Sequence, residues 1–508
     1  MAEKVRVRFA PSPTGPLHMG GVRTALYNYL FAKKHGGDFL LRIEDTDEKR
    51  FVEGAQQYII DSLKWCGIEP NEGAGYGGEL GPYVQSERKT MYQPYAQQLV
   101  DSGHAYIAFD TAEELDKMRD QAKEMGLPNW QYNSVTRSSM KNSISLSKEE
   151  VEKRIAAGDE YTIRMKMPRN EEIKFEDIIR GWVSVNTNNL DDKILLKPGG
   201  MPTYHLANIV DDHLMQITHV IRGEEWLPSA PLHVLLYDAF GWERPQFAHL
   251  PLILRPDGNG KLSKRDGDRL GFPVFPLNWT TSEGELYSGY KEAGYFPGAF
   301  INMLCLLGWN PGNNEEIFTL DEMVDKFSLE RVGKSGARFD PEKTKWFNQQ
   351  YLRSTANEEL AEMVKPMING DFSIPYIAKV CELMKERATF ISDIVNDGQY
   401  FFSEVTSYDD GTVKKKWKED TPTIMEELIS ELEAISDFTT ENIEKVFSAY
   451  LEKKGYGFGN VGPGFRLLVT GSGMGPSMFD ICATLGKEKV LERMKKGIDI
   501  VNQLKATA

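Results

Sequence analysis

Hydrophobic and polar positions change their spacing twice near the start of the chain. Apolar side chains at positions 5–9 alternate with arginines, which is the period of a half-buried strand. The loop PSPTGPLHMGG follows, and residues 22–30 then place apolar side chains at helical spacing until a stop near Gly36. The run FLLRIE (39–44) predicts a second strand. Strand, glycine-rich loop, helix and strand form a βαβ unit, so we predict an α/β fold with a parallel sheet.

Later segments differ from this opening unit. The stretch from about 105 to 200 is polar, with mixed strands such as YTIRMKM and WVSVNT, as expected of an inserted α+β domain. Apolar strand-like runs return at HVIRG and HLPLIL, and beyond about 290 the pattern is helical. We predict an α/β domain in two halves, at 1–104 and 201–254, with an insertion at 105–200 between them. A mixed connecting domain is predicted at 255–338 and an all-α C-terminal region at 339–508.

Composition agrees with a multidomain globular chain. A single core rarely grows past about 250–300 residues, so 508 residues predict two to five domains. The four cysteines lie far apart without a CxxC pair, which favours neither a disulfide framework nor a cysteine zinc site. The N-terminus lacks an apolar signal core, and no run approaches the ~18 apolar residues of a membrane span. We therefore expect a cytoplasmic protein without a membrane partner.

Net charge leaves nucleic-acid binding open. A charge of −15 argues against a nucleic-acid binder on its own, because phosphates attract Lys and Arg. A long acidic chain can still carry a basic stripe, since binding depends on the local field over one face. The run KKKWK (414–418) is either such an RNA-contacting patch or a solvated face.

Two motifs carry candidate chemistry. HMGG (18–21) lies between the first strand and helix, where glycines allow close backbone approach and a helix N-terminus offers free N–H groups to phosphate. KLSKR (261–265) puts three cations on a glycine-flanked loop, which suits a triphosphate that loses pyrophosphate. Alone, the first reads equally as a tight turn and the second as a solvated basic loop. Their occurrence as a pair, about 240 residues apart, favours nucleotide chemistry.

The pair resembles the HIGH and KMSKS signatures of class I aminoacyl-tRNA synthetases, and within that class the chain resembles glutamyl-tRNA synthetases. The stretches that carry the resemblance are RFAPSPTGPLHMGG, FLLRIEDTD, PTYHLANIVDDHLMQITHVIRGEEW, ERVGKSGARFDPEKTKWFNQQYLR and, more weakly, LLVTGSGMGPSMFDICATLGKEKVLER. The resemblance implies a Rossmann-like catalytic domain, an acceptor-stem-binding insertion, a stem-contact domain with the KLSKR loop, and a helical anticodon-binding region.

The resemblance also implies a pocket for glutamate. A second carboxylate calls for guanidinium groups, and an ammonium calls for an acid. Arg8 at the end of the first strand and Arg222 after HVI match the positions for the side-chain carboxylate. Further matches are Tyr204 and Asn208, four apart on one face of a predicted helix, and Ser12 and Glu44 near the α-amino group. Taken singly, each of these residues reads as structural.

The implied reaction is ATP-dependent ligation of glutamate to tRNA(Glu). Glutamate attacks ATP to give glutamyl-adenylate and pyrophosphate, and the 2′-hydroxyl of the terminal adenosine then takes the glutamyl group, releasing AMP. His18, Lys261 and Lys264 match the catalytic positions, and Mg²⁺ would accompany the nucleotide. The residues expected to contact ATP are His18, Gly20, Glu225, Trp226, Lys261, Ser263 and Lys264. The family implies a monomer.

Two departures from the family pattern stand out. Some relatives bind zinc in the insertion through cysteines that follow a strand resembling HAYIAF. Residues 103–130 contain no cysteine here, so we predict no zinc. The segment RLGFPVFPLNWTTSEGELYSGYK (269–291) is longer than the connection that the family has after KLSKR. We interpret it as a surface excursion whose position could affect closure of the KLSKR loop over ATP.

Several alternatives have features that discriminate them. A glutaminyl-tRNA synthetase would carry β-barrel anticodon domains, and a glutamyl-queuosine-type enzyme would lack the C-terminal half. A dinucleotide-binding oxidoreductase could be argued from GSGMG (471–475) after the strand-like run FRLLVT, but the third glycine of the fingerprint is Pro476. A catalytically inactive RNA-binding protein conflicts with intact His18 and Lys264. The sequence leaves open whether tRNA(Gln) is charged as well.

Overall fold

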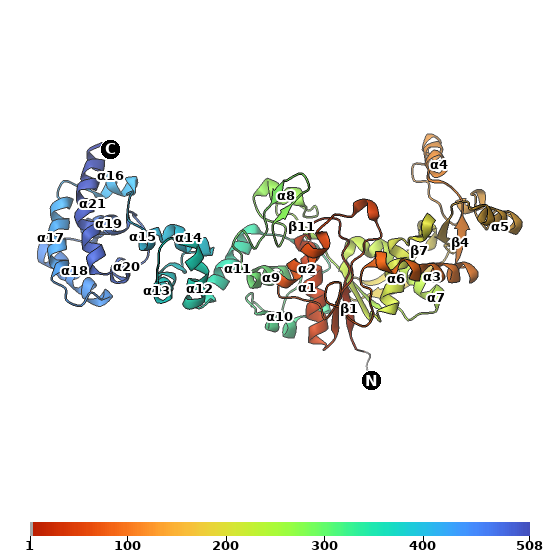
Figure 1. The fold of residues 1–508 in the computed structure, drawn as a ribbon, viewed down its shortest axis with the longest axis horizontal. Coiled ribbons are helices and arrows are strands. Elements are labelled where there is room, and N and C mark those ends of the chain that lie inside the picture. The colour runs from red at the N-terminus through yellow and green to blue at the C-terminus, as the bar shows by residue number, and fades with distance from the viewer. Residues whose placement is uncertain (1–3, 508) are drawn as a thin grey trace. The chain divides into compact units, whose positions relative to one another are not determined.

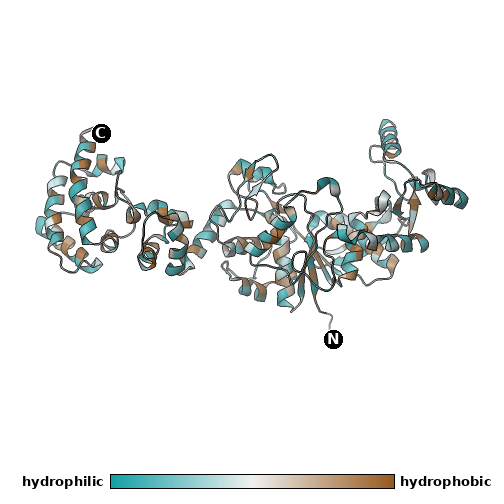
Figure 2. Ribbon diagram, in the orientation of Figure 1, coloured by the Kyte–Doolittle hydropathy of each residue, from teal (hydrophilic) through white to brown (hydrophobic). Residues whose placement is uncertain are grey.

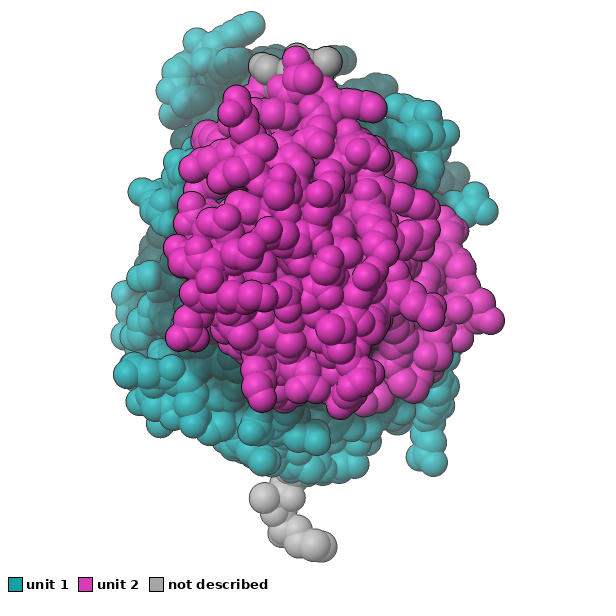
Figure 3. Space-filling model, turned by 90° about the vertical axis from the view of Figure 1, so that its left-hand side faces the viewer, with its two compact units in different colours: residues 1–293, 297–344 teal, residues 294–296, 345–508 magenta. Residues whose placement is uncertain are grey.

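The chain folds into two compact units. The computed structural model describes residues 4–507 (Figure 1). The first unit comprises the chain up to 293 together with 297–344, and the second comprises 294–296 and the chain from 345 onward (Figure 3). Residues 1–3 and 508, which the predicted first and last segments include, lie outside the described residues. Among residues 4–507, no helix combines the length and the apolar composition that crossing a bilayer requires.

A parallel sheet organises the first unit. Its strands are β1 (Arg6–Phe9), β2 (Asp38–Leu41), β3 (Glu72–Gly73), β6 (Glu172–Asp177), β9 (His219–Gly223) and β10 (Gln246–Leu250). β1 pairs with β2 and β2 with β3, while β10 lies between β9 and β6, all in parallel. The Thr218 N–H donates to the Arg6 carbonyl oxygen (2.9 Å), so β9 runs beside β1 on the side away from β2. The chain order of the strands therefore reverses at β1, and α/β sheets bind ligands at such a point.

β1 is buried on both faces, which differs from the half-buried strand predicted from its alternation. Val7 and Phe9 are buried as expected, but Arg8 is only 3 % exposed. A central strand has neighbours on both edges and layers over both faces, and Arg8 is buried together with a carboxylate partner. The alternation of polar and apolar letters thus marks a buried ion pair at this position.

Helices flank the sheet. α1 (Met19–Lys34) follows β1 as predicted, and Val22, Ala25, Leu26 and Leu30 on its apolar positions are all fully buried. The other helices of this part are α2 (Ala55–Trp65), α3 (Lys89–Asp101), α6 (Tyr204–Leu214) and α7 (Ala230–Phe240).

The predicted insertion contains an antiparallel sheet and two helices. Its strands are β4 (Ala105–Ala108), β5 (Thr162–Met165) and β8 (Ile194–Leu196), and its helices are α4 (Ala112–Glu124) and α5 (Lys148–Ala157). The hairpin of β6 and β7 (Gly181–Asn186) also falls within 105–200 in sequence. Because β6 is hydrogen bonded to β10, that hairpin extends the central sheet.

The connecting segment carries KLSKR. It includes β11 (Ile253–Leu254), α8 (Lys264–Leu270), β12 (Trp279–Thr280), β13 (Leu286–Tyr287), α9 (Pro297–Leu306), α10 (Leu320–Lys326) and β14 (Ala337–Arg338). Helix α11 (Pro341–Ser354) then leads from one unit into the other.

The described residues of the second unit form helices without a strand. They are α12 (Asn357–Val364), α13 (Ile374–Met384), α14 (Ile391–Asp397), α15 (Gln399–Phe402), α16 (Asp410–Lys416), α17 (Thr421–Glu433), α18 (Thr440–Lys454), α19 (Phe458–Thr470), α20 (Met478–Leu485) and α21 (Lys487–Thr507). Figure 2 shows hydrophilic and hydrophobic residues interspersed along these helices, as expected of amphipathic helices around a core. The all-α C-terminal region was predicted correctly.

The strand-like reading of FRLLVT was wrong, because these residues end helix α19. Leu467, Leu468 and Val469 are all fully buried there, so the helix has core on several sides. A short unbroken apolar run has no period that separates a buried helix from a buried strand. The GSGMG run is thus a loop after a helix, and the oxidoreductase alternative loses its strand.

The lysine run after residue 413 resolves into two parts. Lys414, Lys415 and Lys416 are exposed on the last turn of α16. Trp417 is 2 % exposed, and its Nε1–H donates to Asn502 Oδ1 (2.9 Å). The tryptophan is an anchor in the core, while the lysines face solvent.

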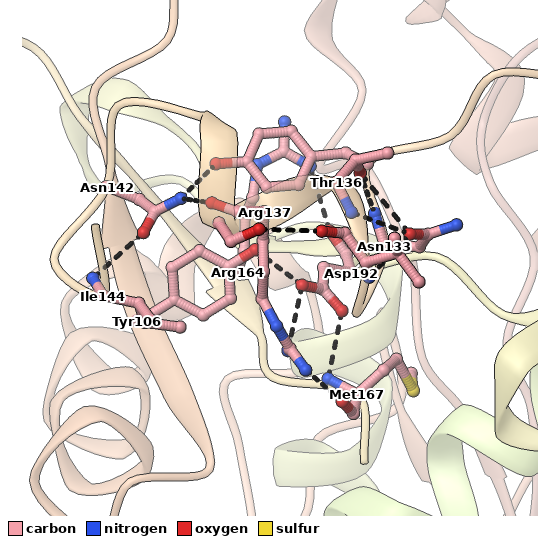
Figure 4. A network of polar contacts seen from close by, with 12 residues as sticks. Tyr106, Asn133, Thr136, Arg137, Asn142, Ile144, Arg164, Met167 and Asp192 are labelled. Carbon is pink, nitrogen blue, oxygen red and sulfur yellow. Dashed lines mark hydrogen bonds and ion pairs between the residues drawn. The ribbon is translucent and has the colours of Figure 1, made fainter. Parts of the chain in front are cut away.

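A polar network holds the insertion together (Figure 4). The fully buried Asp192 carboxylate accepts from the Tyr106 hydroxyl (2.6 Å), Arg137 Nη1 (3.1 Å) and the Met167 N–H (3.0 Å). The Arg164 guanidinium lies 4.1 Å from the centre of the Tyr132 ring. One carboxylate thereby joins three separate stretches of the insertion.

Substituting Asp192→Ala should destabilise the insertion by roughly 3–5 kcal/mol, because the Arg137 guanidinium and the Tyr106 hydroxyl lose a buried acceptor. Hydrogen exchange should speed up in the strands that follow residue 104, while the amides of α1 keep their protection. Lys193→Ala is the matched control, since it removes only the partly exposed pair with Asp191, a kind of contact worth about 0–1 kcal/mol. Equal effects of the two substitutions would contradict a structural role for the network.

Candidate functional site

A cavity of about 700 Å³ opens at the carboxyl ends of β1 and β9. The predicted site residues that line it are Arg8, Ser12, His18, Gly20, Glu44, Tyr204, Asn208, Arg222, Glu225, Trp226 and Lys264. Lys261 and Ser263 lie outside this lining. Side chains from five distant stretches of sequence therefore meet at the edge where α/β folds bind ligands.

His18 caps helix α1. Its Nδ1 accepts from the Gly20 N–H (3.2 Å), so Nδ1 is unprotonated and the ring hydrogen is on Nε2. That Nε2 is buried and has no hydrogen-bond partner among residues 4–507. Burial, helped by the nearby Lys261 ammonium, lowers the pKa of His18 to about 4. His18 is thus a neutral donor at the N-terminus of a helix, where anions bind favourably.

Arg8 and Glu44 belong to a buried ion network. Arg8 binds Asp212 through two parallel bonds, Nε to Oδ1 (2.9 Å) and Nη2 to Oδ2 (3.1 Å). Arg42 binds the same carboxylate (2.8 Å) and also Glu44 Oε1 (3.0 Å), which in addition accepts from Asn208 Nδ2 (3.2 Å). Burial raises the pKa of Asp212, but the two guanidinium groups outweigh it and hold that pKa below its ordinary value. Arg8 therefore has a built-in counter-ion.

Arg222 has only neutral partners. Its Nε donates to His249 Nε2 (3.0 Å), and its Nη1 donates to the Tyr204 hydroxyl (2.9 Å) and to His233 Nδ1 (3.2 Å). Its Nη2 reaches the Trp226 carbonyl oxygen at 3.4 Å. The residue is 5 % exposed, and among the side chains that the structure describes no carboxylate lies within 4 Å of its guanidinium. A buried positive charge at the cavity wall is therefore left without a counter-ion.

The histidines beside Arg222 are held as neutral acceptors. An arginine always donates, so His249 Nε2 and His233 Nδ1 must be unprotonated. His249 Nδ1–H then donates to Asp177 (2.6 Å), and His233 Nε2–H donates to His205 Nδ1 (3.2 Å). Burial lowers the pKa of His249 and of His205 to about 4, and it lowers the pKa of His233 as well. Arg222 is thus positioned without losing its charge.

The KLSKR residues lie at the rim of the cavity. Lys261 is exposed and pairs with Glu225 (2.8 Å). The Ser263 N–H and hydroxyl both donate to Asp266 Oδ2 (2.9 and 2.6 Å), which fixes the start of α8. Lys264, the first residue of that helix, reaches the cavity wall.

The interpretation of residues 269–291 as a surface excursion was correct only in part: residues 269–271, and residues 282–286 around the tip of the β12–β13 hairpin, are exposed. Residues 274–276, between these stretches, and residues 289–290, near the end of the segment, are buried. The Val274 carbonyl oxygen accepts from the Met19 N–H (2.8 Å), and the Phe275 ring lies edge-on to His18, 6.1 Å between ring centres. Phe275 also lines the cavity. The long connection is therefore part of the site wall.

Some residues that hold the lining side chains in place escaped the sequence analysis. Asp212 could have been found, since it continues the face of Tyr204 and Asn208 at the next helical step. Arg42 adjoins the predicted Glu44 but sits inside an apolar strand pattern. His249 and Asp177 lie 72 residues apart and have no local signal.

The sequence and the fold match known proteins. Residues 4–346 match the family described as class I tRNA synthetases (E and Q), catalytic domain, and residues 359–498 match an anticodon binding domain. The chain is 57 % identical to a glutamate–tRNA ligase of Phocaeicola vulgatus, over 98 % of this chain and 99 % of that protein. It is 55 % identical to a glutamate–tRNA ligase of Bacteroides thetaiotaomicron, over 99 % of this chain and 100 % of that protein.

Solved structures show the same likeness. A crystal structure of a glutamate tRNA ligase from Elizabethkingia meningosepticum, in complex with its amino acid, has a TM-score of 0.95 at 52 % identity. A glutamate–tRNA synthetase of Elizabethkingia anophelis has a TM-score of 0.91, also at 52 % identity. Each comparison covers 98 % of this chain and 100 % of the other chain.

The histidines give a pH dependence. With only eight histidines, the ring Cε1 resonances can be followed one by one by NMR. The side chains of His18, His205 and His249 should stay neutral until the pH approaches 4, so their resonances should not shift before that pH. The unfolded chain takes up these protons below about pH 6.5, so stability should fall as the pH drops from about 6.5 to about 4.

The substitution His205→Asn should reduce that slope by up to about 1.4 kcal/mol per pH unit. Unfolding at pH 8, where neither state holds the proton, measures what the substitution itself costs. A His205 resonance that titrates near pH 6.5 would contradict the neutral cluster.

Proposed function

The chain belongs to the class I tRNA synthetase family for glutamate and glutamine, and from this premise we propose which residues carry out its reaction. That reaction is the ATP-dependent ligation of glutamate to its tRNA. The helical second unit agrees with the glutamyl rather than the glutaminyl branch, because the described residues from 345 onward contain no strand of a β-barrel. We further propose, from the resemblance to the family, that the protein acts as a monomer.

Arg222 binds the side-chain carboxylate of glutamate, and the observation that carries this assignment is its missing counter-ion. Burying an unpaired charge is costly, so a guanidinium surrounded by neutral acceptors favours an anion in the cavity. Arg23 and Arg493 are also buried and form no ion pair within 4 Å among residues 4–507, but they donate to backbone carbonyls and neither lines the cavity. Arg222 differs because its free charge faces a space that a ligand can enter.

The opposite wall receives the other end of the amino acid. Glu44 uses Oε1 for Arg42 and Asn208, which leaves Oε2 available to the α-ammonium beside Ser12. Arg8 is already paired with Asp212, so it contributes remaining donors and a fixed position rather than a free charge. Tyr204 hydrogen bonds to Arg222 and keeps the guanidinium oriented.

ATP occupies the part of the cavity next to HMGG. An oxygen of the glutamate α-carboxylate attacks the α-phosphorus in line, and the bond to the bridging oxygen breaks as pyrophosphate leaves with the electron pair. His18 Nε2–H, free of protein partners, donates to the phosphate in the transition state. Lys261 and Lys264 neutralise charge on the departing pyrophosphate, while Gly20, Glu225, Trp226 and Ser263 contribute to ATP binding.

The second step transfers the glutamyl group. The 2′-hydroxyl oxygen of the terminal adenosine attacks the carbonyl carbon of glutamyl-adenylate, and the bond from that carbon to the phosphate oxygen breaks. AMP departs with the electron pair, and the hydroxyl proton passes to the phosphate of AMP or to water. Both steps use positioning and charge stabilisation, so no covalent bond to the enzyme is required.

Mg²⁺ fits as an ion carried by the nucleotide. Among the described residues, no group of three His, Cys, Asp or Glu side chains could hold a metal. Mg²⁺ commonly keeps its waters and binds mainly through substrate phosphates, so such a cage is not required. Bound in this way, the ion would neutralise phosphate charge beside Lys261 and Lys264.

The substitution Arg222→Leu should raise the KM for glutamate and lower kcat/KM, because the carboxylate loses a buried cation. The fall in kcat/KM should correspond to roughly 2–5 kcal/mol of activation free energy. The KM for ATP should change little. Steady-state aminoacylation with varied glutamate measures the effect, and Arg244→Leu is the matched control at a partly exposed arginine paired with Asp238. Unchanged kcat/KM in Arg222→Leu would make Arg222 a structural residue and leave discrimination to Arg8.

Discrimination against glutamine follows from the same charge. A neutral amide near Arg222 leaves the guanidinium unpaired, and sites built around a polar group can reject the analogue that lacks it by ~10⁴–10⁵. Loss of the cation should therefore shrink the preference for glutamate over glutamine in parallel assays of amino-acid activation.

Purified protein should contain well under one zinc per chain. The Asp192 network and the packing of Tyr106, Leu115, Tyr132 and Met140 order the insertion without cysteine ligands. Elemental analysis tests this, with activity measured before and after treatment with a chelator. Stoichiometric zinc whose removal abolishes activity would reveal a ligand set that the described residues do not show.

A further inference from the structure

The long connection after KLSKR places an aromatic ring against a catalytic lysine. Lys264 Nζ lies 3.2 Å from the centre of the Tyr287 ring, within the range of a cation–π contact. Among residues 4–507, no carboxylate lies within 4 Å of this ammonium. The other lysine of the motif, Lys261, rests instead on Glu225 at 2.8 Å. Both lysines of the KLSKR motif therefore have a partner within the protein.

The Tyr287 ring is held in place from several sides. Its hydroxyl donates to the Glu285 carboxylate, which increases the electron density of the ring. The Phe275 ring meets it edge-on at 6.0 Å, and Phe275 in turn meets His18. The two signature motifs are thus joined by two consecutive aromatic contacts that the segment 269–291 supplies.

The hairpin that carries the ring is anchored to helix α2, which follows the first βαβ unit. Trp279 packs edge-on against Tyr58 of α2, with 5.2 Å between ring centres. The Tyr58 hydroxyl donates to the Leu277 carbonyl oxygen (2.5 Å), and the Leu277 N–H donates back to it (3.1 Å). The ring below Lys264 is therefore fixed to the same framework that carries His18.

We propose that Tyr287 is a positioning residue that docks the Lys264 ammonium in the resting enzyme, so that the triphosphate of ATP must draw the lysine off the ring. This proposal rests on the proposed role of Lys264 in ATP binding. One ammonium cannot keep its full contact with the ring and also turn to a phosphate oxygen. The contact with the Tyr287 ring therefore competes with ATP for Lys264, and it forms again when pyrophosphate leaves.

The competition predicts in which direction the Kd for ATP changes when the ring is removed. A ligand that binds only the undocked form has its affinity reduced by the fraction of enzyme in that form. A cation–π contact at a partly exposed site corresponds to about a two- to fivefold population ratio. Removing the ring should therefore tighten ATP binding by about two- to fivefold, whereas loss of a merely structural residue would weaken it.

The test is equilibrium titration with Mg-ATP, without glutamate or tRNA, so that no chemistry occurs. Tyr287→Leu should lower the Kd for ATP about two- to fivefold, and Tyr287→Phe, which keeps a ring, should stay close to the unmodified enzyme. Leu286→Ala is the matched control, because this exposed neighbour on β13 points to the opposite face of the strand. Thermal unfolding of each variant verifies that the hairpin remains folded.

A double-mutant cycle separates the dock from the role of Lys264. Lys264→Ala should weaken ATP binding, and adding Tyr287→Leu to it should have no further effect. If Lys264→Ala leaves the Kd unchanged, the proposed role of Lys264 fails and the dock fails with it. If Lys264→Ala weakens binding but Tyr287→Leu leaves the Kd unchanged or raises it, only the dock is overturned.

Discussion

Two adjacent aspartates on α6 fix the arginines around the cavity. Asp212 binds Arg8 of β1 and Arg42 after β2, and Asp211 binds Arg88 through Nε at 2.7 Å. Both carboxylates are at most 1 % exposed. Removing Asp212 would leave Arg8 without its ion pair, and removing Asp211 would do the same to Arg88, so these arginines depend on the two aspartates. The positions of Arg8 and Glu44, and thus one wall of the site, follow from this constraint.

Arg222 is a buried arginine like Arg8, but its hydrogen-bond partners carry no charge. Its partners His249, His233 and Tyr204 accept hydrogen bonds from the guanidinium, but they do not cancel its charge. A carboxylate in their place would satisfy the guanidinium internally, and a protonated histidine would repel it. Burial that keeps these histidines neutral therefore serves to orient the cation while leaving its charge for the ligand. On the proposed assignment, a missing counter-ion together with a place in the cavity lining distinguishes Arg222 from Arg23 and Arg493.

Local patterns predicted those parts of the site that lie on regular elements. The end of the first strand placed Arg8, and helical spacing joined Tyr204 to Asn208, because periodicity alone determines which side chains share a face. Resemblance to a family supplied Arg222 and the lysines. The contact of His249 with Asp177 depends on pairing between β10 and β6, which no local pattern encodes. FRLLVT misled because a helix buried on several sides loses the polar stripe by which helices are recognised.

The two substrates meet walls of different character. On the proposed assignment, glutamate is bound between the carboxyl ends of neighbouring strands, by side chains that a network of hydrogen bonds holds in position. The ATP lysines sit on the rim, and each has an internal partner, Glu225 for Lys261 and Tyr287 for Lys264. On the proposed assignment, glutamate binds to a preorganised pocket, whereas ATP binding includes the release of two existing contacts. Because those contacts can form again once the triphosphate is cleaved, the same loop that stabilises departing pyrophosphate also provides a way to let it go.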